Sequence, residues 1–106
     1  MPKYLIEGSY TAEGLRGLMK DKASGRKAEV EKLLANVGGR LEGLYYALGH
    51  ADVFVLVDLP SAASVAAVAV AVNASGLIRT RTIPLLTVEE TDQALSTNVS
   101  YRPPGA

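Results

Sequence analysis

Apolar and polar residues along the chain follow patterns that predict short strands and helices. Residues 3–10 have the pattern of a strand. Apolar residues then share one helical face over residues 12–20, and over residues 26–37 they recur three and four positions apart. Lys22-Ala23-Ser24-Gly25 is expected to break the helical pattern between these segments, and Gly38-Gly39 is expected to end the second helix.

Three further strands are predicted, over residues 41–48, 52–59 and 77–83. Only Gly49-His50-Ala51 separates the first two of them, and a connection this short predicts a hairpin. Pro84 is expected to end the strand over residues 77–83, because proline has no backbone N–H to give to a ladder of hydrogen bonds.

The C-terminal part of the chain is predicted to form one more helix, over residues 87–98. Thr87 and Glu90 stand three positions apart, which is the spacing of a capping box at the start of a helix. The residues that follow, 101–106, are expected to form a tail.

Residues 62–75 carry both a strand pattern and a helix pattern. Val68, Val70 and Val72 alternate as they would in a strand, whereas Val65, Val68 and Val72 are spaced like one face of a helix. Because alanine fills the gaps and is the best helix former, we expect a helix. Ser61 and Gly76 then stand at its ends.

The order of these elements predicts the fold class. Strand, helix, strand, strand, helix and strand, followed by a terminal helix, is the βαββαβ order of an α+β ferredoxin-like fold. Such a fold has an antiparallel sheet with its helices on one face. We expect a single domain over residues 1–106, because a chain of this length has room for one.

The strand over residues 52–59 is apolar on both sides. Val53, Val55 and Val57 point to one face of the sheet, and Phe54 and Leu56 point to the other. A sheet with helices on one face only should be polar on its free face. We therefore expect a second subunit on the free face, in a homodimer or a larger homo-oligomer. Cover by the C-terminal helix or tail is the alternative.

Composition excludes several function classes. Eleven basic and eleven acidic side chains balance to zero net charge, which argues against a nucleic-acid partner. No cysteine and a single histidine leave no metal site or metal cofactor to expect. The longest apolar run, residues 65–72, is too short to span a membrane, and the first residues lack the pattern of a signal peptide. We expect a cytoplasmic protein with no membrane partner and no cofactor.

Short segments spread along the chain carry a family resemblance. They are Pro2-Lys3-Tyr4-Leu5-Ile6, Gly8-Ser9-Tyr10-Thr11, Val57-Asp58-Leu59-Pro60, Val72-Asn73-Ala74-Ser75-Gly76, Arg79-Thr80 and Pro84-Leu85-Leu86-Thr87. On these segments the chain resembles the GYD family of small bacterial and archaeal proteins. The Gly-x-Tyr-Asp element that gives the family its name reads Gly49-His50-Ala51-Asp52 here, with Ala51 in place of Tyr. The resemblance implies a fold of the dimeric α/β-barrel group and implies no particular activity.

The predicted topology brings polar residues from separate segments to one end of the sheet. They are Ser9, Thr11, His50, Asp52, Asn73 and Arg79. The helix start at Thr11 adds free N–H groups, and Arg79 adds a planar fork of donors, so this end should favour an anion. A small anionic metabolite is the ligand that we expect there, with His50 as a proton-sensitive contact.

Each of these residues also has a purely structural interpretation. His50 can be an exposed turn residue, Asp52 can bind turn amides, and Thr11 and Asn73 can cap helices. Arg79, like Arg81, can be solvated or paired with acids across a subunit interface. His50 and Asp52 together have the spacing of a general base oriented by a carboxylate, but no nucleophile accompanies them and no catalytic residue is assigned.

Three functions remain open at this point. The first is a small homo-oligomeric protein that binds an anionic metabolite at the strand-end edge. The second is a cofactor-free enzyme similar to the monooxygenases and isomerases of the dimeric α/β-barrel group. The third is a protein whose only role is assembly or interaction. A deep pocket that desolvates His50 or a tyrosine favours the enzyme, and a shallow polar depression favours binding or assembly.

Overall fold

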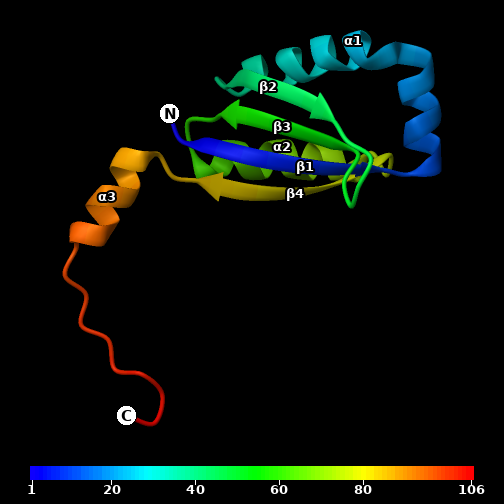
Figure 1. The fold of residues 1–106 in the computed structure, drawn as a ribbon. Coiled ribbons are helices and arrows are strands. Elements are labelled where there is room, and N and C mark those ends of the chain that lie inside the picture. The colour runs from blue at the N-terminus through cyan, green and yellow to red at the C-terminus, as the bar shows by residue number, and fades with distance from the viewer.

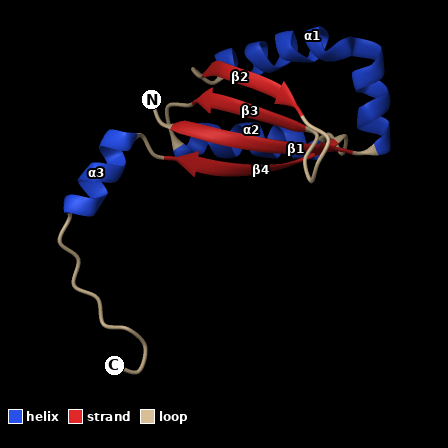
Figure 2. Cartoon of the chain, viewed as in Figure 1, coloured by secondary structure: helices blue, strands red, loops and turns tan.

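The computed structural model describes residues 1–106 and has the predicted order of elements, followed by a terminal helix (Figures 1 and 2). The elements are β1 (Lys3–Tyr10), α1 (Ala12–Asn36), β2 (Arg40–Tyr46), β3 (Val53–Asp58), α2 (Ala62–Ala74), β4 (Ile78–Leu85) and α3 (Val88–Ser96). The expected α+β, ferredoxin-like class is confirmed. No helix is both long enough and apolar enough to cross a membrane.

The sheet is open and has the strand order β2-β3-β1-β4, with every neighbouring pair antiparallel. Residues of β1 therefore pair with a strand on each side: Ile6, for example, pairs with Val55 of β3 and with Thr82 of β4. α1 packs on β2 and β1, and α2 packs on β4. In Figure 1, α2 lies behind the sheet, so the view looks onto the face that no helix covers.

The core lies between the sheet and the helices. Val53, Val55 and Val57 of β3 are buried there together with Leu34 of α1 and Leu59. Alternate residues of one strand thus meet the helices, as the period of a β-strand requires. Only 10 of the 106 residues are buried, so this core is thin for a chain of this length.

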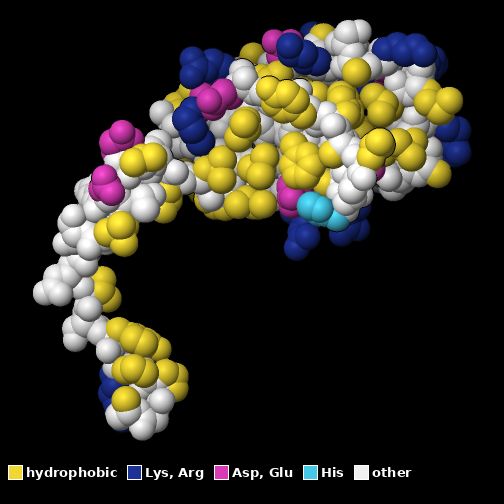
Figure 3. Space-filling model, in the orientation of Figure 1, with side chains coloured by type: hydrophobic (Ala, Val, Ile, Leu, Met, Phe, Trp, Pro, Cys, Tyr) yellow, Lys and Arg dark blue, Asp and Glu magenta, His cyan; other side chains and the backbone are white.

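The opposite side of the sheet, which we call the open face, carries an apolar band. Leu5, Phe54 and Leu56 lie half-buried at its centre, and Tyr45 and Ile83 lie more exposed beside them. Figure 3 shows hydrophobic side chains over most of this face, with charged side chains gathered at its margins. The expectation that both faces of the sheet are apolar is confirmed, and nothing within the chain covers this one.

The two helices predicted over residues 12–20 and 26–37 are the two arms of the bent helix α1. The bend lies at Lys22, whose backbone has φ 66° and ψ 166°, within the expected break. The first arm begins at Thr11, where the chain passes close to the start of β4. Figure 1 shows this arm leaving the end of the sheet and the second arm returning along β2.

The helix predicted over residues 62–75 is confirmed as α2, so the helix period is the correct reading of this segment. Ser61 and Ser64 form a capping box at its start. After its end, Gly76 has φ +73°, in the left-handed region that favours glycine. The outer side of α2 is exposed and apolar, with Val70 69% exposed.

Two expectations about boundaries are wrong. Pro84 does not end the last strand, because β4 continues through it to Leu85 and pairs Pro84 with Tyr4. β4 is an edge strand, and a proline is tolerated there because no strand on the outer side needs its missing N–H. The connection between β2 and β3 is also longer than expected. It runs through residues 47–52 and is closed by a hydrogen bond from Ala47 N to Asp52 O of 2.8 Å.

The C-terminal helix does not cover the open face, so that alternative is also wrong. α3 and the residues after it extend away from the end of β4 (Figure 1). The radius of gyration is 16.9 Å, whereas a compact chain of this length has about 13 Å.

Gly14 and Gly17 of α1 provide a matched test of this packing. A Cβ added at Gly14 would lie 2.0 Å from the carbonyl oxygen of Leu77, whereas one at Gly17 would meet nothing within 4 Å. We expect Gly14→Ala to lower the free energy of unfolding by about 1–3 kcal/mol, as overpacking does. Gly17→Ala should raise it by up to about 1 kcal/mol, because alanine favours helix.

Urea unfolding of both variants against the wild type measures these changes. Equal stabilisation by the two substitutions would contradict the close approach of α1 to the start of β4.

Candidate functional site

A cavity of about 100 Å³ lies between the sheet and the two covering helices. We call it the helix-side cavity. Of the 19 residues that line it, 14 are hydrophobic. Those from the strands include Ile6, Leu44, Val53, Val55, Val57 and Ile78, and those from the helices include Val30, Leu33, Leu34, Val68, Ala69 and Val72. No sequence pattern indicated this cavity.

The helix-side cavity exists because α1 and α2 do not close over the sheet. α1 packs at the β2 side and α2 at the β4 side, and the two helices make no substantial contact with each other. α2 contributes Val68, Ala69 and Val72 to the lining, and these side chains are too small to fill the space. The cavity therefore follows from the small apolar side chains that dominate α2.

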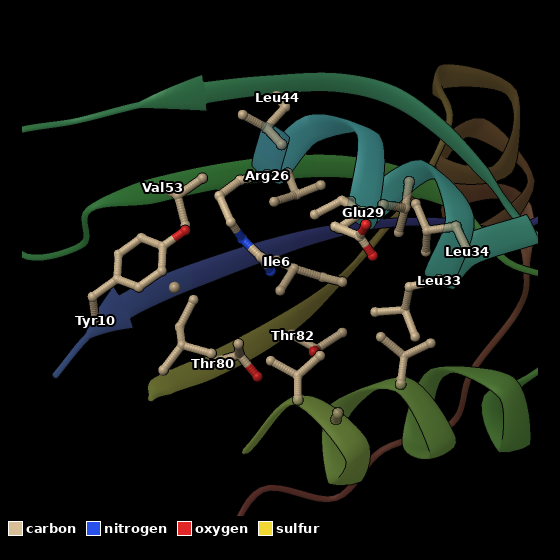
Figure 4. A pocket seen from close by; sticks show the side chains of 18 of the residues that line it. Ile6, Tyr10, Arg26, Glu29, Leu33, Leu34, Leu44, Val53, Thr80 and Thr82 are labelled. Carbon is tan, nitrogen blue, oxygen red and sulfur yellow. The ribbon is translucent and has the colours of Figure 1, made fainter. Parts of the chain in front are cut away.

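Polar side chains are also present in the lining of the helix-side cavity. Tyr10, Tyr46, Arg26 and Glu29 all contribute to it. Figure 4 shows the Tyr10 ring and the Arg26 side chain pointing into the space between the sheet and the helices. Arg26 Nη1 lies 3.8 Å from Asp21 Oδ2, a long ion pair that leaves guanidinium hydrogens free.

Burial is the largest cause that raises the pKa of Tyr46, to about 12, with a further contribution from the neighbouring Tyr10. Arg26 acts in the opposite direction. At neutral pH the Tyr46 phenol therefore keeps its proton and is a hydrogen-bond donor. Together with Arg26, it gives the mostly apolar cavity hydrogen-bond donors for one acceptor group of a ligand, beside the negative charge of Glu29.

A second depression, of about 410 Å³, lies at one end of the sheet, and six of its seven lining residues are polar or charged. We call it the strand-end hollow. Its lining residues are Glu7, Ser9, His50, Ala51, Arg79, Thr80 and Arg81. Figure 3 shows the single histidine of the chain at the margin of the apolar band, next to acidic and basic side chains.

The charges of the strand-end hollow leave two cations without partners. His50 Nε2 lies 3.0 Å from Glu7 Oε1, and Ser9 Oγ donates to the His50 carbonyl at 3.3 Å. Glu7 stands opposite Arg81 in the ladder, yet its carboxylate binds His50. Neither Arg79 nor Arg81 forms an ion pair within the chain. The hollow is therefore suited to an anion.

Half of the predicted strand-end residues line this hollow. Ser9, His50 and Arg79 come together there, as the topology predicted. Glu7 and Arg81 join them and were missed, although each stands two positions from a predicted residue on the same strand face.

The other three predicted residues make structural hydrogen bonds outside the hollow. Thr11 caps α1 and accepts from Gly14 N at 3.1 Å. Asp52 Oδ2 accepts from Tyr10 N at 2.8 Å. Asn73 Oδ1 accepts from Thr80 N at 3.0 Å, which ties the end of α2 to β4.

The proposed pairing of His50 with Asp52 as base and orienting carboxylate is wrong. The carboxylate that binds His50 belongs to Glu7, and Asp52 is engaged by the backbone of β1. A spacing of two positions in a loop does not ensure that two side chains meet, and here His50 and Asp52 bind different partners.

A third cluster of charges ties three strands together at the far end of the open face. Asp58 is 2% exposed, and its carboxylate oxygens lie 2.9 Å from Lys3 Nζ and 2.9 Å from Arg40 Nη2. Lys3 also binds Glu42 at 2.7 Å. The hydrogen bonds from Lys3 and Arg40 hold the pKa of Asp58 below its usual value. The role of this Asp58 cluster is structural.

A family model matches most of the chain. The model of the GYD domain matches residues 4–95, from β1 into α3. The chain belongs to the GYD domain family. No curated protein and no solved structure matches it with significant similarity. In this member of the GYD family, the segment Gly49-His50-Ala51-Asp52 supplies two lining residues of the strand-end hollow, His50 and Ala51.

Asp58→Asn tests the buried ion pairs. The substitution leaves Lys3 and Arg40 without their shared carboxylate, and we expect it to lower the free energy of unfolding by about 1–3 kcal/mol at pH 7. Because folding lowers the pKa of Asp58, its contribution is present above the unfolded value near 4 and is lost as the pH falls through the lower, folded value. The wild type should therefore lose stability more steeply below about pH 4 than the variant does.

Urea unfolding between pH 2.5 and pH 7 measures both effects. Glu42→Gln is the matched control, because it removes an exposed partner of Lys3 and should cost at most about 1 kcal/mol. Identical pH profiles for the wild type and Asp58→Asn would contradict this role.

Proposed function

We propose that this GYD-family protein is a homodimeric binder of a small ring-sized molecule, which it holds in the helix-side cavity. The observation that carries the proposal is an apolar cavity with a few polar groups, one of them a tyrosine of raised pKa. An apolar cavity of about 150 Å³ is enough to hold benzene. The 100 Å³ here is smaller than that, so a single small ring is the largest group that fits, and a dinucleotide or flavin is far too large.

The polar groups of the cavity favour a ligand with one acidic or acceptor group. Arg26 supplies a positive charge with free guanidinium hydrogens, and the protonated Tyr46 supplies a neutral donor. A carboxylate accepts well from both. The ligand class that fits is a small aromatic acid, with its ring among the valines and its carboxylate toward Arg26.

The protonated Tyr46 in the lining also allows a second candidate, a cofactor-free enzyme of the monooxygenase or isomerase type. A phenol beside an apolar cavity can donate a hydrogen bond to a substrate oxygen on which negative charge develops, whereas its raised pKa makes full transfer of the proton harder. Ligand binding is the preferred function, because the cavity and its donors support it without any reaction step.

The proposed homodimer rests on the open face and on the exposed area of the chain. The accessible surface is 7381 Å², whereas a compact monomer of this mass exposes about 5,700 Å². The excess is larger than the roughly 800 Å² that each partner buries in a stable interface. A second copy on the apolar band of Leu5, Phe54 and Leu56 would bury the exposed face of the sheet, and the extended residues after β4 contribute the rest of the excess (Figure 1).

Benzoate is a suitable probe of the helix-side cavity. At ten times its dissociation constant it should stabilise the wild type by about 1.4 kcal/mol, which thermal unfolding detects. Val68→Phe should abolish this stabilisation by filling the cavity, because Val68 is a buried lining residue. Val70→Phe, on the exposed outer side of the same helix, is the matched control and should retain it.

Arg26→Leu separates charge recognition from apolar binding. The variant should lose its preference for benzoate over toluene while still binding toluene. Equal benzoate stabilisation in the wild type and Val68→Phe would rule out this cavity as the binding site.

Two neighbouring residues of β3 give opposite tests of the dimer. Phe54→Asp places a charge on the open face and should give a folded monomer, measured by light scattering and circular dichroism. Val55→Asp places the charge in the core and should unfold the chain, because a buried unpaired charge costs several kcal/mol, roughly. Leu48→Asp, at a fully exposed loop position, should leave the mass unchanged. A folded dimer of Phe54→Asp would contradict an interface on the open face.

A further inference from the structure

The C-terminal arm, residues 86–106, carries exposed apolar side chains, and α3 packs on no other helix or strand of its own chain. Val88 and Leu95 of α3 are 75% and 79% exposed, and they lie on one side of the helix, seven positions apart. Thr87 and Glu90 close a capping box, so the helix starts at a well-defined position. A short capped helix with one apolar side is stable only where that side is buried.

The arm is acidic. It holds Glu89, Glu90 and Asp92 and a single basic residue, Arg102. The Glu90 carboxylate accepts from Thr87 N at 2.9 Å and is engaged within the helix. Glu89 and Asp92 form no ion pair within the chain. Two free carboxylates therefore flank the apolar side of α3.

The strand-end hollow offers the complementary charges. Arg79 and Arg81 are exposed and have no acidic partner, and the hollow lies next to the apolar band of the open face. A helix with an apolar side and two carboxylates matches an apolar surface with two guanidinium groups beside it.

The hollow and the arm of one chain lie at opposite ends of β4. Arg79 stands near the start of the strand, and six residue steps of about 3.3 Å separate it by roughly 20 Å from Leu85. From there the arm points away from the sheet (Figure 1). A second copy of the chain can supply an arm that reaches the strand-end hollow, whereas the chain's own arm cannot. If two open faces meet about a twofold axis that crosses the strands, the arm end of each copy lies over the hollow end of the other.

We propose that, in the homodimer, α3 of each copy docks beside the strand-end hollow of the other, with Glu89 and Asp92 paired to Arg79 and Arg81. The docking rests on the proposed homodimer and goes beyond it, because it assigns the anion of the hollow to the second copy. The arm then buries Val88 and Leu95 against the partner. The hollow becomes an enclosed site to which both copies contribute residues.

Charge reversal and mixing test the docking with full-length protein. The double variants R79E/R81E and E89K/D92K each place like charges together, so each should form a homodimer about tenfold or more weaker than the wild type at low salt. A one-to-one mixture of them restores both pairings, because each arm then meets a hollow of opposite charge. Sedimentation velocity measures the affinities, and native mass spectrometry identifies the heterodimer.

The control pair is R16E/K20E, which reverses two exposed basic residues of α1. It should dimerise like the wild type, and its heterodimer with E89K/D92K should remain weaker than the wild type, because only one of the two pairings is restored. Recovery of the wild-type affinity only in the R79E/R81E mixture supports docking between copies. An arm that folded back onto its own chain would gain nothing from mixing.

Three results would overturn the proposal. A wild-type dimer whose affinity neither reversal changes would refute the docking and leave the dimer standing. A monomeric wild type would refute both. Weak homodimers without recovery on mixing, together with phosphate stabilising the wild type but not R79E/R81E, would assign the hollow to a free small anion.

Discussion

The constraint on which the rest of the structure depends is a four-stranded sheet that is apolar on both faces and covered on one. β3 shows it within a single strand, since Val53, Val55 and Val57 face the helices while Phe54 and Leu56 face outward. No rearrangement of the strand can bury both sets at once, because a shift by one residue only exchanges the faces. The open face therefore needs a partner, whereas the helix-covered face contains the cavity in which the chain can hold a ligand.

The helix face is incomplete for a related reason. The side chains of α2 are mostly alanine and valine, which favour close approach but fill little volume. α1 bends at Lys22 and lies along β2, away from α2. Small side chains and separated helices together leave the helix-side cavity. The small side-chain volume that makes the core thin therefore also leaves room for a ligand.

The period at which apolar residues recur in each segment made most of the fold predictable. Alanine-rich helix propensity decided the ambiguous α2, and the break near Lys22 coincides with the bend of α1. Pro84 was misjudged because its place on an edge strand depends on the strand order, which local sequence does not contain. The Asp58 cluster was missed for the same reason, since Lys3, Arg40 and Asp58 are distant in the chain and meet only in the assembled sheet.

The strand-end hollow was half predictable. Topology brought Ser9, His50 and Arg79 together, whereas Asp52 and Asn73 were taken up by backbone groups whose positions only the folded chain defines. The helix-side cavity could not be inferred at all, because it depends on the gap between two helices and not on any residue pattern.

The central claim is that the open face is an interface, and the mass of the wild-type chain in solution tests it most directly. Sedimentation equilibrium at micromolar concentrations should give a mass of about 22 kDa or more, at least twice the 11.1 kDa of the chain. A single species of 11.1 kDa that remains soluble across this range would contradict the claim, because the apolar band would then be stable in water.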